Sequence, residues 1–221
     1  MASGGRDRPI LLTGFAPFGG DALNPSAQVA TALDGADVCG RVVADVLPVA
    51  RAGVAERLPR LFKEVDPALV LLLGLANGRP APAVERVALN VLDFPITDND
   101  GVQPVDEPVV PGGPAAYLAS VPVKAILAAW REARLPGYVS NTAGTYMCNA
   151  TFYLASHLGA SRAVPVGLVH LPYLPEQAGR DGVAPAPSMA LDMQVECVRM
   201  ALRAAATHVG PDLSIAAGMV S

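Results

Sequence analysis

A cysteine at a predicted helix start is the first candidate for chemistry in this sequence. Cys148 follows the segment 142–147 and precedes the apolar run 152–154, so we expect it at or near the N-terminus of a helix. There the helix dipole and the unpaired backbone N–H groups stabilise a thiolate, the nucleophilic form of cysteine. The alternative is a buried structural cysteine, the more common situation for an intracellular thiol.

His170 and Glu85 are the residues that could activate such a nucleophile. His170 ends the apolar segment 166–169, and a histidine at the carboxyl end of a strand can reach a neighbouring strand-to-helix turn. Glu85 interrupts another apolar segment beside Arg86, and a carboxylate bonded to an imidazole fixes its tautomer and stabilises imidazolium. The alternatives are a structural histidine and a Glu85–Arg86 pair that points into solvent on opposite faces. Spacing alone does not choose between them.

Two phenylalanines lie in a turn rich in glycine and proline, directly after the first predicted strand. Phe15 and Phe18 fit no helix or strand periodicity there, so they either plug the end of the core or form the wall of a ligand pocket. The surrounding glycines lack the lysine of a P-loop and the GxGxxG order. We therefore exclude a phosphate-binding loop.

The elements that must position these residues alternate along the chain. Short apolar runs rich in β-branched residues alternate with longer helical stretches, which predicts an α/β fold with a mostly parallel sheet covered on both faces. Asn24 is expected to cap a helix that begins at Pro25. A turn-rich stretch, 95–113, is expected to be a long loop. The expected strands are 10–13, 41–49, 69–74, 84–92, 137–140 and 164–170, and the expected helices are 25–33, 50–65, 123–133, 148–157 and 188–208.

Length and composition exclude several classes of protein. We expect one domain over residues 1–221, with residues 1–8 as a flexible N-terminal extension. A charged fraction of 16%, below the usual value of about 25%, favours a large core and a surface partly covered by a partner subunit. The net charge of −4 argues against nucleic acid as a partner, and no apolar run approaches the roughly 20 residues that span a membrane. Three scattered cysteines favour a cytoplasmic location. Because the sequence contains no CxxC pair, we expect no structural metal site.

Taken together, the motifs resemble one known family. The chain resembles the pyroglutamyl-peptidase I family, also called the pyrrolidone-carboxylate peptidases, from about residue 10 to residue 208. The motifs that carry the resemblance are TGFAPFGG at 13–20, NPS at 24–26, VERVALN at 84–90, DNDG at 98–101, GGPAAY at 112–117, TAGTYMCN at 142–149 and HLPYLPEQ at 170–177.

The resemblance implies an enzyme and a set of residues. It implies a cysteine exopeptidase that removes an N-terminal pyroglutamyl (5-oxoproline) residue from peptides through an acyl-enzyme, with Glu85, Cys148 and His170 as the catalytic residues. It also implies a single-domain, three-layer α/β/α fold with a twisted, mixed sheet. The family members need no metal or cofactor, are cytoplasmic and commonly form homotetramers.

A substrate pocket is implied in the same way. By resemblance Phe15, Phe18 and Tyr146 would form the wall around the uncharged lactam ring, and Asn24 would bond the lactam carbonyl. An apolar slot suits this substrate because pyroglutamate has no free amine. Tyr146 stands where the family often has phenylalanine, so its hydroxyl needs a partner.

Two positions near the substrate depart from the family pattern. Leu75 stands where the family usually has glutamine, and Pro95 stands where it usually has arginine. If that arginine polarises the scissile carbonyl, its loss removes transition-state stabilisation. Two further hypotheses therefore stand beside the peptidase. The chain could be a weakened homologue that binds a lactam or other small ligand without turnover, or a hydrolase for a different N-terminal cap or cyclic amide.

Overall fold

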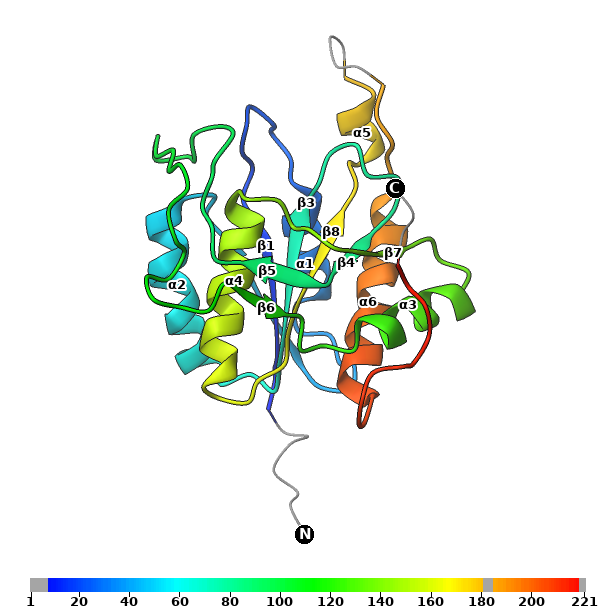
Figure 1. Ribbon diagram of the computed structural model, residues 1–221. Helices are drawn as coiled ribbons and strands as arrows, with labels where there is room; N and C mark the ends of the chain where they lie inside the picture. The colour runs from blue at the N-terminus through cyan, green and yellow to red at the C-terminus, as the bar shows by residue number, and fades with distance from the viewer. Residues whose placement is uncertain (1–7, 181–184, 219–221) are drawn as a thin grey trace.

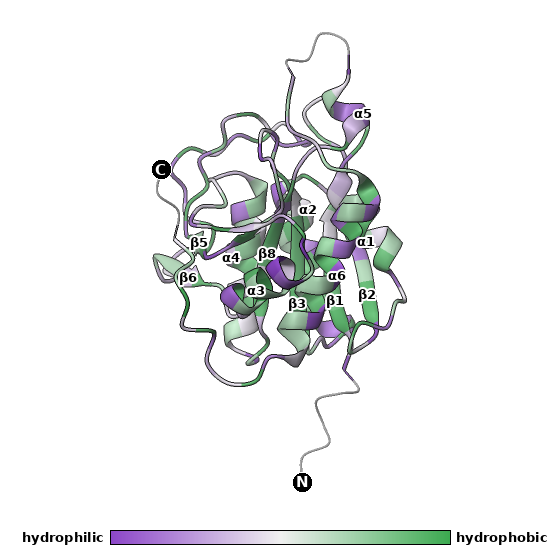
Figure 2. Ribbon diagram, turned by 90° about the vertical axis from the view of Figure 1, so that its right-hand side faces the viewer, coloured by the Kyte–Doolittle hydropathy of each residue, from purple (hydrophilic) through white to green (hydrophobic). Residues whose placement is uncertain are grey.

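The computed structural model describes residues 8–180 and 185–218. They form three layers, a central twisted sheet with helices on both of its faces (Figure 1). The predicted α/β/α fold is confirmed. Figure 2 shows apolar residues concentrated in the strands and on the helix faces that cover them.

The sheet has six strands in the order β2-β1-β3-β8-β4-β7. β1, β2, β3 and β8 run parallel, whereas β4 runs antiparallel to β8 and parallel to β7, so the sheet is mixed and mostly parallel as predicted. Every residue of β3 is buried, as expected for a central strand covered on both sides. The strands are β1 (Ile10–Phe15), β2 (Val42–Leu47), β3 (Leu69–Leu75), β4 (Ala83–Glu85), β7 (Tyr138–Ser140) and β8 (Val166–Leu171).

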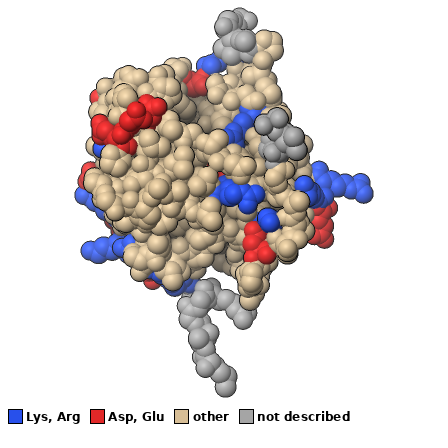
Figure 3. All heavy atoms as spheres, in the orientation of Figure 1, with Lys and Arg blue, Asp and Glu red and all other residues tan. Residues whose placement is uncertain are grey.

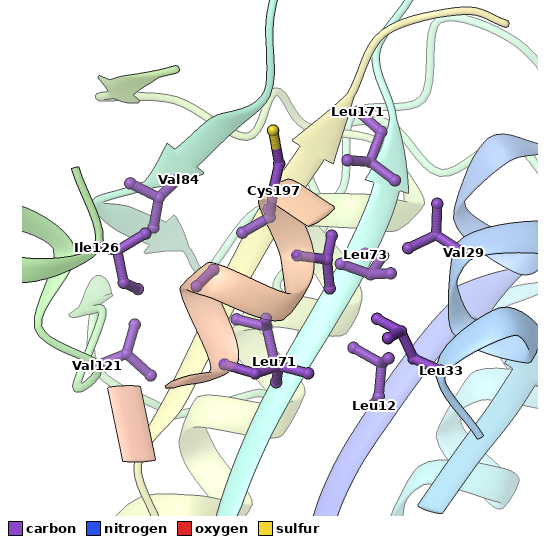
Figure 4. Close-up of a cluster of buried hydrophobic side chains, with 14 of the residues drawn as sticks. Leu12, Val29, Leu33, Leu71, Leu73, Val84, Val121, Ile126, Leu171 and Cys197 are labelled. Carbon is purple, nitrogen blue, oxygen red and sulfur yellow. The ribbon is translucent and has the colours of Figure 1, made fainter. Parts of the chain in front are cut away.

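Helices cover the two faces of the sheet. One face carries α1 (Pro25–Leu33), α3 (Val123–Glu132) and α6 (Leu191–Thr207), and the other carries α2 (Arg51–Glu64) and α4 (Met147–Ala160). A short helix, α5 (Pro175–Ala178), stands at one end of the molecule. Figure 4 shows the apolar side chains packed between the sheet and the α1/α6 face. In the part of the chain that the structure describes, no helix is long and apolar enough to cross a membrane.

The start of α1 is capped as predicted. The Asn24 Oδ1 atom accepts a hydrogen bond from the backbone N–H of Ser26 at 3.1 Å, and Pro25 occupies the first turn. A side-chain cap satisfies a backbone donor that has no partner inside the helix, which stabilises the helix end. The rigid start of α1 in turn holds the turn after β1.

One expected strand is wrong. The segment 84–92 is not continuous: β4 ends at Glu85, and β5 (Val87–Leu89) pairs antiparallel with β6 (Ala116–Leu118), a strand that the sequence did not predict. The chain changes partners at Arg86, whose N–H donates to the Ser140 carbonyl while its own carbonyl accepts from Ala119. These tertiary partners divide an apolar run that local periodicity presents as one strand.

The predicted loop 95–113 is confirmed, and a buried aspartate organises it. Asp98 is only 4% exposed, and its carboxylate accepts hydrogen bonds from three backbone N–H groups, those of Arg51, Asp100 and Val102. The bond from Arg51 joins this loop to the start of α2. The loop is therefore anchored on the helix beside it.

The expected N-terminal extension, 1–8, lies mostly outside the described residues, which begin at Arg8. Arg8 itself is bound to the fold. Its Nη2 atom lies 2.8 Å from Asp66 Oδ1, and its guanidinium also donates to the carbonyls of Asp66 and Pro67. Arg8 therefore does not belong to the extension.

Candidate active site

The three residues predicted to carry chemistry lie together at one end of the sheet. Cys148 is the second residue of α4, His170 is the penultimate residue of β8, and Glu85 is the last residue of β4. The sheet register pairs His170 with Gly74 on one neighbouring strand and with Ala83 on the other. These pairings place the imidazole between the end of β3 and the start of β4.

Glu85 and His170 form a buried hydrogen-bonded pair. The Nδ1 atom of His170 lies 2.7 Å from Glu85 Oε1, and the two residues are 3% and 0% exposed, respectively. The hypothesis that Glu85 points into solvent is therefore wrong, because its carboxylate is inside the protein. Arg86 instead points away, and its Nε atom donates to Asn141 Oδ1 at 2.9 Å.

Cys148 and His170 meet above Gly74. A Cβ atom placed on Gly74 would lie 2.8 Å from Cys148 Sγ and 3.1 Å from His170 Nε2. Both reactive atoms thus occupy the space that any larger residue would fill. Sequence reasoning missed this role, although a glycine inside an otherwise continuous apolar strand is typical of a close approach by other groups.

The surroundings of His170 favour the protonated imidazolium. Burial acts to lower the pKa of His170, but the Cys148 thiolate and the Glu85 carboxylate outweigh it and raise this pKa to about 9. Protonated imidazole donates from both nitrogens. Nδ1 donates to Glu85, and Nε2 faces the sulfur and the cavity beside it.

The start of α4 offers backbone donors next to the sulfur. The first bond within this helix runs from the Ala150 N–H to the Tyr146 carbonyl at 3.1 Å, so the N–H groups of Met147, Cys148 and Asn149 have no partner inside the helix. The N-cap residue, Tyr146, forms no side-chain hydrogen bond to this helix start. Free N–H groups at a helix N-terminus can stabilise an oxyanion that develops beside the nucleophile.

A cavity of about 500 Å³ opens beside Cys148 and His170. Its wall combines apolar side chains with a smaller number of polar ones, a composition typical of small-molecule sites. The apolar side chains include Phe18, Leu75, Pro95, Ile96 and Tyr146, and the polar ones, besides Cys148 and His170, include Asp21, Asn77, Arg79, Thr142 and Tyr173.

Two of the residues expected in the pocket do not line this cavity. Phe15 is 2% exposed and belongs to the hydrophobic core between the sheet and the α2/α4 face. Asn24 is also 2% exposed, and its amide is already in use: Nδ2 donates to the Ala16 carbonyl, while Oδ1 accepts from Ser26. The Nδ2 donor that the resemblance assigns to the lactam carbonyl therefore bonds the backbone of Ala16 in this structure.

The extra hydroxyl of Tyr146 has a partner in the loop 95–113. It donates to the Thr97 carbonyl at 3.1 Å, and the ring packs edge-on against Phe94 with centroids 4.7 Å apart. Burial raises the pKa of Tyr146 to about 12, so the hydroxyl keeps its proton as the donor. In the chain, Pro95 lies between Phe94 and Thr97, the two residues that Tyr146 contacts. Proline has no charge, so this position brings no cation to the cavity.

Arg79 is a site residue that the sequence reasoning missed. Among the described residues that line the cavity, it is the only Lys or Arg, and its Nη1 atom lies 2.7 Å from Glu85 Oε1. Within residues 8–180 and 185–218, no cluster of His, Cys, Asp and Glu side chains is placed to hold a metal ion.

A thiol and an imidazole that meet at the end of a sheet, with a carboxylate on the far imidazole nitrogen, define a cysteine hydrolase of the α/β class. Comparison with known proteins gives the family. A family model described as pyroglutamyl peptidase matches residues 8–208, and the chain belongs to this family. It is the family that the sequence motifs indicate.

Individual relatives agree with this assignment. The pyrrolidone-carboxylate peptidase of Chromobacterium violaceum is 47% identical over 202 residues, covering 91% of this chain and 94% of the relative. That of Thermococcus kodakarensis is 46% identical over 211 residues, covering 93% and 97%. The crystal structure of pyroglutamyl peptidase I from Bacillus amyloliquefaciens aligns with a TM-score of 0.88 at 36% identity, covering 94% of this chain and all of that one.

Proposed function

We propose that the chain is a cysteine exopeptidase that hydrolyses the amide bond after an N-terminal pyroglutamyl residue. Membership of the pyroglutamyl peptidase family supports this activity. The observation that carries it furthest is the buried bond between Glu85 and His170, with the sulfur of Cys148 beside the other imidazole nitrogen. That arrangement suits acyl transfer through a thioester.

In the acylation step, the Cys148 thiolate attacks the pyroglutamyl carbonyl carbon. The oxyanion that forms accepts hydrogen bonds from N–H groups at the start of α4. His170 then gives its Nε2 proton to the leaving nitrogen, the C–N bond breaks, and a thioester remains on Cys148. Glu85 orients the imidazole and stabilises its positive charge until the proton is transferred.

In the deacylation step, neutral His170 accepts a proton from water at Nε2. The resulting hydroxide attacks the thioester, the C–S bond breaks, and pyroglutamate leaves as the acid while the thiolate and imidazolium re-form. Each step uses side chains of this chain and water, so we assign no metal or cofactor to the reaction. EDTA is accordingly expected to leave the rate unchanged.

The cavity wall supports an uncharged ring as the group bound beside the sulfur. Phe18, Leu75 and Tyr146 offer apolar surface, and pyroglutamate has no ammonium group that would need a free carboxylate. The one acidic side chain in the described wall, Asp21, is paired with Arg180. An aminopeptidase for free N-termini would need that carboxylate unpaired.

We further propose a cytoplasmic homotetramer. Support comes from the family resemblance, from three free thiols, and from apolar side chains such as Val105 and Leu118, which are 66% and 72% exposed in the single chain. Exposed apolar groups of this kind favour burial against another subunit. Sedimentation equilibrium of the purified chain tests the tetramer, and a monomer at micromolar concentration would contradict it.

The activity is tested with fluorogenic amides. We expect the parent chain to release the fluorophore from a pyroglutamyl amide and to leave the prolyl and alanyl amides intact. Cys148→Ala should reduce the rate to background with unchanged thermal unfolding, because loss of one sulfur is a small packing change. Cleavage of the alanyl amide at a comparable rate would contradict the proposed specificity.

A weakened homologue is the second candidate, and Pro95 in the cavity wall motivates it. On that reading the chain binds 2-pyrrolidone but turns over the pyroglutamyl amide slowly, and Leu75→Gln with Pro95→Arg raises kcat by about tenfold or more. If the double variant is no faster than the parent, the weakened-homologue reading fails. Preferential cleavage of another cyclic amide in the same assay would instead indicate a hydrolase for a different N-terminal cap.

A further inference from the structure

Arg79 lies in the connection 76–82 between β3 and β4 and reaches back into the active site. Its side chain is only 20% exposed. Nη1 donates to Glu85 Oε1 at 2.7 Å, and Nη2 donates to the Thr142 carbonyl at 3.1 Å. The guanidinium also lies over the ring of Tyr138, 6.0 Å from its centroid. Three surrounding elements therefore hold it in one place.

Glu85 offers the same oxygen to two donors. Oε1 accepts from His170 Nδ1 and from Arg79 Nη1, both at 2.7 Å, while Oε2 is buried and has no hydrogen-bond partner among the described residues. The guanidinium charge is thus separated from the imidazole by a single carboxylate oxygen. Like charges this close repel each other strongly inside a protein, where screening is weak.

Arg79 also connects the two halves of the catalytic arrangement. Glu85 supports His170, whereas Thr142 belongs to the loop that leads into α4 and Cys148. One planar guanidinium holds both, and its fixed fork of donors defines their separation. A displacement of either half would therefore be transmitted to the other.

We propose that Arg79 is a positioning residue of this active site, which aligns Glu85 and the Thr142 loop with His170 and sets the pH at which the His170 imidazolium loses its proton. This inference rests on the proposed function only in so far as the imidazolium is the acid of acylation. The titratable and charged groups that surround His170 in the described residues are Cys148 on α4, Glu85 on β4, Arg79 beyond it, and Asp21, Tyr146 and Tyr173 around the cavity.

The charge of Arg79 opposes the imidazolium, so its removal should allow His170 to keep its proton to higher pH. We define the His170 midpoint as the pH at which half of the His170 imidazolium has lost its proton. In Arg79→Met we expect this midpoint to rise by about one pH unit. Arg79→Lys keeps the charge, so the midpoint should stay near that of the parent. A single ammonium cannot match the fork that holds both Glu85 and Thr142, so the lysine variant should lower kcat with little change in KM.

Arg86 provides a matched control. It follows Glu85 directly and bonds Asn141, the residue before Thr142, but its guanidinium forms no hydrogen bond or ion pair with Glu85 or His170. Arg86→Met therefore removes the same charge and a similar contact to the same loop. We expect its His170 midpoint to equal that of the parent.

The experiment is an NMR titration of the full chain labelled with ¹⁵N-histidine, with His157 and His208 as internal references, alongside the pH dependence of kcat/KM. A raised midpoint in Arg79→Met alone supports the proposal. An unchanged or lowered midpoint, or the same shift in Arg86→Met, overturns it. If Arg79→Met does not fold, the lysine variant decides, because parent kcat in Arg79→Lys contradicts the positioning role.

The titration needs no substrate, so the two proposals fail separately. A shifted midpoint without cleavage of any pyroglutamyl amide would overturn the proposed function and leave the charge effect of Arg79 in place. Cleavage by the parent with identical midpoints in all variants would do the reverse.

Discussion

Gly74 decides how closely the sulfur and the imidazole can approach. Because a Cβ at this position would lie 2.8 Å from Cys148 Sγ, Gly74→Ala must displace the nucleophile or the histidine. Displacement of reacting groups by about 1 Å costs about 100-fold in rate, and we expect kcat to fall by about that factor. Steady-state kinetics measure the loss, and thermal unfolding shows whether the fold is retained. Parent kcat in a folded variant would mean that the two groups do not meet over β3.

The three thiols should differ in reactivity in an order that exposure does not predict. Cys39 is exposed, Cys148 is half-buried, and Cys197 is buried in the core, where burial raises its pKa to about 12. Pairing with His170 should nevertheless make Cys148 the first site of alkylation. Peptide mass mapping after limiting iodoacetamide tests this order. Labelling of Cys39 first would show that access, not activation, controls the reaction.

The catalytic candidates could be chosen from sequence because simple rules place them. A residue at a helix start and a residue at a strand end carry signals that are visible in the local pattern, and these signals point to Cys148 and His170. Arg79 could not be chosen in this way. Thr142 is distant from it in the chain, and its contact with Glu85 depends on the path of the connection 76–82. For Asn24 the two expectations separate: the local pattern predicts the cap of α1 that the structure shows, whereas the bond to the lactam, implied by the resemblance, stays a prediction.

At the scale of elements, the loop 95–113 supplies the side-chain N-cap that α2 lacks. The N-cap residue of α2, Ala50, has no side-chain acceptor, and Asp98 accepts the hydrogen bond from the Arg51 N–H instead, at 2.7 Å. The same carboxylate closes the DNDG turn through Asp100 and Val102. A single side chain therefore couples a helix start to the loop that carries Pro95 and Thr97.

Replacement of Asp98 should destabilise the protein in a manner that depends on pH. Burial acts to raise the pKa of Asp98, but the backbone N–H bonds from Arg51, Val102 and Asp100 outweigh it and lower this pKa. The carboxylate therefore contributes stability above the unfolded pKa of about 3.9, and this contribution is lost as pH falls through the folded value. We expect Asp98→Asn to cost about 1–3 kcal/mol at neutral pH.

Urea unfolding at pH 7 and at about pH 3 measures this effect. The difference between parent and Asp98→Asn should shrink in acid. Asp37→Asn is a suitable control, because within residues 8–180 and 185–218 the Asp37 carboxylate accepts a single exposed, local bond, from the Gly40 N–H. An equal difference at both pH values would contradict a role for the charge.

Element boundaries followed from sequence where the pattern is local. The predicted helix over 25–33 matches α1, because its cap and its apolar face lie in the same stretch of chain. The division of 84–92 into β4 and β5 was not predictable, since it depends on Ser140 and Ala119 as partners of Arg86. The helix α5 is too short, at four residues, to show a periodic pattern.

At the scale of the molecule, the reversed direction of β4 brings the active site together. The connection 76–82 turns back at the end of β3, so β4 begins beside His170, with Ala83 paired to it, and Glu85 follows within the same strand. A parallel β4 would need a crossover to the opposite end of the sheet. Alternating apolar runs predict a doubly covered sheet, but not which strand reverses, and this is why the mixed topology could be inferred only from family resemblance.

The surface has few charges, as the composition requires. On the face in Figure 3, Asp and Glu atoms gather near the loop 95–113, and much of the remaining area is uncharged. In the fold as a whole, Val105 and Leu118 are exposed and contribute apolar area to the molecular surface. The low charged fraction of 16% and these exposed apolar side chains support the proposed burial of part of the surface between subunits.

The C-terminal segment after α6 closes the outer layer of the fold. Both carboxylate oxygens of Asp212 accept from the start of α3, with distances of 2.9 Å to the Lys124 nitrogen and 3.0 Å to the Ala125 nitrogen. The N-cap residue of α3, Pro122, offers no side-chain acceptor, so this helix is capped by a residue 88 positions away in the chain. The contact joins α6, the segment 209–218 and α3 into one layer.

Loss of this long-range cap should lower global stability without altering the active site. We expect Asp212→Ala to reduce the free energy of unfolding by about 1 kcal/mol, and Asp212→Asn to lose less, because an amide oxygen still accepts from a backbone N–H. Urea unfolding gives the free energies, and kcat on the pyroglutamyl amide should match that of the parent, since Asp212 lies outside the cavity beside Cys148. Equal stability of Asp212→Ala and the parent would mean that the C-terminal segment does not hold α3.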